Sequence, residues 1–74
     1  MNKSQSCDCG LALRKAQVVL NVKSVDIAKH FDVFPQHVSA WRNCKNMKVN
    51  LVIDLCSFFN MSIDEFIELG RNES

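Results

Sequence analysis

The chain has 74 residues, of which 47% are hydrophobic and 23% are charged, and its formal net charge is +1. This length suits one domain with one small core, and the composition is that of a globular protein, which excludes a disordered chain. No apolar run is long enough to cross a bilayer and the start MNKSQSCDCG lacks a signal-peptide pattern, so a cytoplasmic protein without a membrane role is expected.

The first predicted element is a helix over residues 11–20. Asn21, directly after it, tolerates the left-handed backbone with which many helices end. Residues 1–10 are expected to form a flexible tail. The apolar side chains that recur at helical spacing in this first helix are Leu13, Ala16, Val19 and Leu20.

Two short helices are expected next, over residues 24–31 and 35–43, separated only by Asp32-Val33-Phe34. Ser24 can cap the earlier helix. Pro35 suits the first turn of the later one, because the amide proton that it lacks would be unpaired there. The buried side of this pair is expected to consist of Ile27, Ala28, Phe31, Val38 and Trp41.

Two further helices complete the prediction, over residues 49–59 and 63–69. Ser62 can cap the last helix, whose first turn carries Asp64 and Glu65, and Gly70 ends it. No strand pattern is present, so we expect an all-α, compact five-helix domain over residues 11–70, with tails at 1–10 and 71–74. The apolar side of helix 49–59 is expected to be Leu51, Val52, Leu55, Cys56 and Phe59.

The four cysteines do not suggest disulfides or a metal centre. Cys56 lies in the apolar run LVIDLCSFF and is expected to be a buried thiol. Cys7 and Cys9 are one residue apart, which is not the spacing of a zinc site, and no second pair follows. We therefore expect no metal and no cofactor. An enzyme is not expected either, since no nucleophile and base occupy matching elements and no glycine-rich phosphate loop occurs.

Charge is distributed unevenly along the chain. Residues 11–50 carry seven basic and two acidic side chains, whereas residues 51–74 carry one basic and five acidic ones. Such a field orients a protein on a polyanion, although solvated surfaces alone can also produce it.

The predicted helix 35–43 has an outward side that is polar but uncharged. Because Val38 and Trp41 use its inward side, the other residues have no place in a core. Amide and hydroxyl groups suit the edges of bases in the major groove, and cations suit phosphates. The residues expected to read bases are Gln36, His37, Ser39, Ala40 and Asn43. Those expected to contact phosphates are Lys23, Ser24, Lys29, Arg42, Lys45, Asn46 and Lys48. The alternative for the basic residues among them is that they only keep the domain soluble.

Two segments carry a resemblance to a known family. Residues 27–41 read IAKHFDVFPQHVSAW, and residues 60–66 read NMSIDEF. In this order they resemble the helix-turn-helix domains of the lambda repressor and Cro type, also called XRE-like, over residues 13–69. The chain departs from that pattern at Asp32, which replaces the turn glycine but tolerates a left-handed backbone. It also departs at Phe34, which replaces a capping Ser or Thr and can reach a thymine methyl group or a sugar.

The resemblance implies a sequence-specific transcriptional regulator from a phage, prophage or plasmid. Such a protein acts as a homodimer on a palindromic double-stranded DNA operator, with helix 35–43 in the major groove. Part of the dimer contact is expected from the last helix, which cannot bury all of its apolar residues. These residues are Ile63, Phe66, Ile67 and Leu69.

Three alternatives stay open at this point. The domain can be a monomer that dimerises only on DNA. It can be an antitoxin that represses its own operon and also binds a toxin. It can also be an adaptor that has lost DNA binding and holds a protein. Because 74 residues leave no room for a separate effector domain, control by abundance or by a regulatory protein partner is favoured over control by a small ligand.

Overall fold

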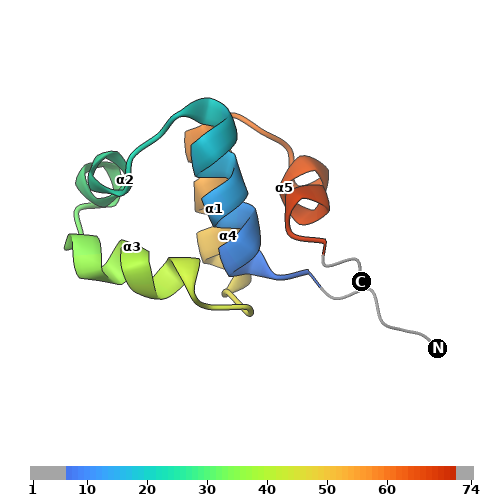
Figure 1. Cartoon of the computed structure of the whole chain (residues 1–74), viewed down its shortest axis with the longest axis horizontal. Helices are drawn as coiled ribbons and strands as arrows, with labels where there is room; N and C mark the ends of the chain where they lie inside the picture. Colours follow the sequence, from blue (N-terminus) through green and yellow to red (C-terminus); the bar gives the residue numbers. More distant parts are fainter. Residues whose placement is uncertain (1–6, 72–74) are drawn as a thin grey trace.

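The computed structural model describes residues 7–71, so residues 1–6 of the expected tail 1–10 and residues 72–74 of the expected tail 71–74 lie outside the described residues. The described range contains five helices and no named strand, which confirms the all-α, five-helix class. Figure 1 shows α2 and α3 on one side of α1, with α5 on the other side and α4 behind α1. The helices are α1 (Cys9–Leu20), α2 (Ser24–Phe31), α3 (Pro35–Arg42), α4 (Val49–Phe59) and α5 (Ile63–Leu69).

One cluster of buried side chains joins all five helices. Each helix supplies one large side chain with no exposed area, and Cys56 is also buried, as expected. Phe31 and Trp41 are half-buried against this cluster, with their rings edge to face at 5.5 Å. The five fully buried large side chains are Leu13, Ile27, Val38, Leu55 and Phe66. Among the described helices, none is long and apolar enough to cross a membrane.

The end of α1 differs from the expected pattern. Val19 and Leu20 belong to the apolar repeat that predicts this helix, but they are 69% and 44% exposed, so the repeat continues beyond the part of α1 that the core covers. The buried residues of α1 are Gly10, Ala12, Leu13, Ala16 and Gln17. Val19, seven residues after Ala12, lies at the edge of this stripe and in the last turn of the helix. Leu20 lies on the stripe but in the last turn, where less of the core covers it.

The start of α1 also differs, because the helix begins at Cys9 instead of residue 11. Asp8 caps it by accepting a hydrogen bond from the Leu11 amide at 3.0 Å. The Asp8 amide donates to the Gly70 carbonyl at 2.8 Å, and the Cys9 amide donates to the Lys45 carbonyl at 2.9 Å. Residues 7–10 therefore belong to the folded body and not to a tail.

Three non-glycine residues with positive φ end helices, namely Asn21, Asp32 and Asn60. Asp32 adopts φ 57° and ψ 49°, which confirms that it supplies the left-handed turn between α2 and α3. The expected cap of α2 was wrong, since Lys23 is the N-cap residue. Ser24 is the first helical residue instead, and its hydroxyl accepts a hydrogen bond from Gln17 Nε2 at 3.2 Å.

The N-terminus of α5 forms the expected capped structure. The Ser62 hydroxyl accepts from the Glu65 amide at 3.1 Å, and the Glu65 carboxylate accepts from the Ser62 amide at 2.8 Å. Gly70 ends this helix, and it is buried where the chain before α1 passes close to it. A Cβ at this position would lie 2.6 Å from the Asp8 carbonyl oxygen, so only glycine fits.

Candidate nucleic-acid interface

The α2–turn–α3 unit is held by backbone hydrogen bonds and packing. The Val33 amide donates to the Ala28 carbonyl at 2.9 Å, which ties the turn to the end of α2. On α3, Val38 is fully buried, and Trp41 packs its ring edge to face against Phe31 of α2. These contacts fix the direction in which the remaining side of α3 points.

That remaining side of α3 is solvent-exposed, as the sequence pattern predicts. All five residues expected to read bases are exposed, and the helix ends at Arg42, so that Asn43 is its C-cap residue. Asn43 Nδ2 donates to the Ser39 carbonyl at 3.0 Å, which leaves the Asn43 side-chain oxygen to accept from a ligand. The structure thus brings together on one surface Gln36, His37, Ser39, Ala40 and Asn43.

An exposed aromatic pair marks the start of α3. Phe34 is the N-cap residue, makes no side-chain capping hydrogen bond and is 71% exposed. Its ring stacks on that of His37, with 6.2 Å between the ring centroids and 18° between the planes. A large apolar side chain therefore stands in solvent beside the hydrogen-bonding side of α3, at a position where a Ser or Thr would stabilise the helix.

A polar cleft of about 230 Å³ lies between α1 and the end of α3. Arg14 and Arg42 line it together with Ser39 and Asn43. The Arg14 guanidinium donates to the Gly10 carbonyl at 3.3 Å, whereas the half-buried Arg42 has a buried Nε without a hydrogen-bond partner. Two guanidinium groups beside the outward side of α3 form a suitable site for a phosphate.

Arg14 was not among the residues expected to contact phosphate. Its outward direction follows from helical spacing, since Ala12, Leu13 and Ala16 face the core. Helical spacing does not show, however, that α1 lies next to the end of α3. This close approach depends on Gly10, where a Cβ would lie 2.5 Å from the Arg42 carbonyl oxygen.

The other expected phosphate contacts are spread over the same part of the molecule. Lys23 and Ser24 lie at the start of α2, Lys29 lies in its last turn, and three more residues follow α3. All of these are exposed except Ser24, which is half-buried. The three that follow α3 are Lys45, Asn46 and Lys48.

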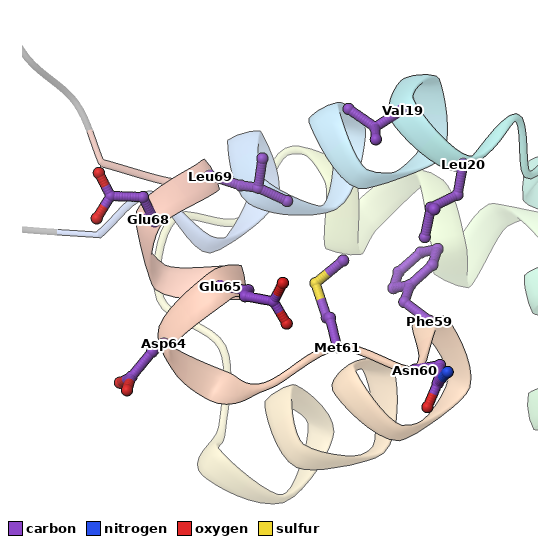
Figure 2. A pocket seen from close by; sticks show the side chains of 9 residues that line it. All are labelled: Val19, Leu20, Phe59, Asn60, Met61, Asp64, Glu65, Glu68 and Leu69. Carbon is purple, nitrogen blue, oxygen red and sulfur yellow. The ribbon is translucent and has the colours of Figure 1, made fainter.

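The residues expected at a dimer contact on α5 divide into three groups. Ile63 and Ile67 are 44% and 40% exposed and, four residues apart, share one side of the helix. Phe66 is fully buried, so its assignment to a dimer contact was wrong. Leu69 is half-buried and lies on the other side of α5, toward α1 (Figure 2).

Comparisons with known proteins found no relative of this chain. No protein-family model matches the chain, and no curated protein or solved structure matches it either.

Proposed function

We propose that this chain is a sequence-specific DNA-binding regulator of the helix-turn-helix class, with α3 in the major groove and α2 across the DNA backbone. The observation that supports this most strongly is the exposed, uncharged side of α3 on a helix whose opposite side is buried. Gln36 is its central base-reading residue. The side-chain amide of a glutamine can donate a hydrogen bond to N7 of adenine and accept one from the N6 amino group of the same base.

The electrostatics of this part of the molecule suit DNA. The α3 surface itself is uncharged, so it need not be neutralised to approach base edges, while Arg14 and Arg42 flank it with positive charge. Phosphate contacts from such residues position the protein, and the uncharged groups specify the sequence. Each phosphate contact should make the affinity depend more steeply on salt, by about 0.9 in the log–log slope.

A homodimer on a palindromic operator is part of this proposal. In that arrangement the two α3 helices enter major grooves about 34 Å apart, which is one turn of DNA. Ile63 and Ile67 are the side chains of α5 with enough exposed apolar area to contribute to a twofold contact.

The proposal is tested by selection from a random pool of double-stranded DNA with the purified chain. We expect enrichment of an inverted repeat whose half-sites are one helical turn apart. Gln36→Ala should relax the selected sequence at one base pair in each half-site, and Ser57→Ala, an exposed polar change on α4, should leave it unchanged. A pool that yields no common sequence would contradict the regulator and favour a protein-binding adaptor.

A further inference from the structure

A second surface lies away from α3, between the end of α1, the α4–α5 turn and α5. It is a groove of about 590 Å³, which we call the α1–α5 groove. Figure 2 shows Leu20 of α1 and Phe59 of α4 pointing toward one another at one end, with Met61 in the middle and Leu69 on the α5 side. The groove is lined by Val19, Leu20, Phe59, Asn60, Met61, Asp64, Glu65, Glu68 and Leu69.

The apolar side chains on the α1 side of the groove are exposed to solvent. Val18, Val19 and Leu20 form a run of three apolar residues that are 81%, 69% and 44% exposed, and of these Val19 and Leu20 line the groove. Such a run on the surface of a small domain is unfavourable in water unless a partner covers it. The size of the groove is that of a site for a few side chains or a small ligand.

The charge on the α5 side is entirely negative within the groove lining. Asp64, Glu65 and Glu68 are exposed, and the lining contains no Lys or Arg. Glu65 is held by its hydrogen bond with the Ser62 amide, and Glu68 has Arg71 at 3.5 Å in an exposed ion pair. In Figure 2, the Glu65 side chain points to the groove side of α5, toward Met61, whereas the Asp64 and Glu68 side chains point away from the groove. Carboxylates in this position select a partner with positive charge around an apolar centre.

A second copy of the chain fits this groove poorly. A twofold contact through the groove would bring the three carboxylates of one copy against the same three of the other, and like charges oppose such a contact. A contact between the groove and the basic part of another copy would form a ring or an open chain of copies instead of a twofold dimer, and it would use the surface next to α3. The α5 side with Ile63 and Ile67 is separate, so a dimer formed there leaves the groove open.

We infer that the α1–α5 groove binds a segment of a different protein, one that inserts two or three apolar side chains and carries Lys or Arg beside them. α3 and α5, which lines the groove, lie on opposite sides of α1 (Figure 1), so this partner can be held while α3 is in use. The inference does not depend on DNA binding, since it rests only on the apolar lining and its carboxylates.

The test is selection from a random 12-residue peptide library displayed on phage, with the full chain as the bait. We expect enriched peptides in which Leu, Ile, Met or Phe alternate with Lys or Arg. For a synthetic peptide with the enriched sequence, Leu20→Ser should weaken binding about tenfold, as expected for loss of one buried apolar anchor. The matched control is Val25→Ser on α2, because Val25 is also 44% exposed, and it should leave the affinity unchanged.

The charge requirement is tested with Asp64→Asn/Glu68→Gln, compared with Asp54→Asn on α4. The double variant should weaken the same peptide about threefold at low salt and reduce the dependence of its affinity on salt, and the control should do neither. Peptides without a basic excess, or peptides that bind equally to Leu20→Ser, would overturn the inference. It would also be overturned if sedimentation equilibrium showed a dimer that Leu20→Ser converts to monomer, since a second copy would then occupy the groove.

Discussion

The outward side of α3 and the α1–α5 groove both consist of side chains that the small core does not use, but their chemistry is opposite. The α3 side presents hydrogen-bonding groups next to two arginines, and the groove presents apolar side chains next to three carboxylates. The first suits a charged, hydrated polymer with readable edges, and the second suits an apolar segment with positive charge. One core of about ten buried side chains thus supports two surfaces of opposite chemistry.

The helices that carry the two surfaces also begin differently. α5 begins with a complete capping box, in which Ser62 and Glu65 satisfy one another's amides. α3 begins at Phe34 and Pro35, without a side-chain cap. The missing cap makes the start of α3 less stable than it could be, so the stability of the fold does not explain Phe34, and we propose a contact of its ring with DNA as the reason.

The largest effect is expected from a change that removes both surfaces together. Phe66→Ala deletes a fully buried ring from the shared core and should lower the free energy of unfolding by about 3–5 kcal/mol. Urea denaturation followed by circular dichroism measures this. Ile53→Ala on α4, where the side chain is 45% exposed, is the control and should cost less than about 1.5 kcal/mol. Equal losses for the two variants would contradict the placement of Phe66 in the core.

A smaller effect should separate the two surfaces. In Gly10→Ala, the new Cβ would lie 2.5 Å from the Arg42 carbonyl oxygen and 2.9 Å from that of Cys44, so the end of α3 must shift. We expect a loss of about 1–3 kcal/mol in stability and weaker binding to the selected DNA, because Arg42 moves. Binding of the selected peptide should not change once the variant is folded. If DNA affinity stays at the wild-type value, the Arg14–Arg42 cleft is not part of the interface.

Phe34→Ser should change stability and DNA affinity in opposite directions. A serine at the N-cap of α3 can accept an amide hydrogen bond, so the free energy of unfolding should rise by about 0.5–1 kcal/mol. Affinity for the selected DNA should fall about fourfold, which corresponds to the roughly 0.8 kcal/mol of one buried methyl contact. Replacing thymine by uracil in the duplex should weaken the wild type by the same factor and leave the variant unaffected. A variant that binds both duplexes like the wild type would exclude a thymine contact by Phe34.

The smallest effect concerns the core at high pH. Burial raises the pKa of the Cys56 thiol above its ordinary value of 9.0. The folded state keeps this proton where the unfolded chain loses it, so the contribution to stability is complete below pH 9.0 and is lost as the pH rises through the folded value. The difference in unfolding free energy between the wild type and Cys56→Ala should therefore shrink from pH 7.5 to pH 10. A constant difference would contradict the raised pKa.

The outward side of α3 could be predicted from the sequence, because its periodicity and the left-handed turn at Asp32 are local properties. Val38 and Trp41 face inward at helical spacing, and the residues between them have to face outward. For the same reason the helices themselves were predicted to within about two residues.

The groove could not be predicted in this way. Helical spacing shows which side of α1 is apolar, but it does not show where the core stops, and so it does not reveal that Val19 and Leu20 are exposed. In α5, four apolar residues in seven positions do not reveal that Phe66 alone is buried completely. The Arg14–Arg42 cleft and the placement of residues 7–10 depend on two glycines that allow distant backbones to meet, which no local pattern encodes.

The most direct test of the central claim is fluorescence anisotropy with the selected duplex and a scrambled duplex of the same composition, over a salt series. We predict that the wild type binds the selected duplex at least about tenfold more tightly. Gln36→Ala should abolish most of that preference and keep the slope of log affinity against log salt, because phosphate contacts remain. Equal binding of both duplexes by the wild type, with no effect of Gln36→Ala, would show that α3 does not read bases.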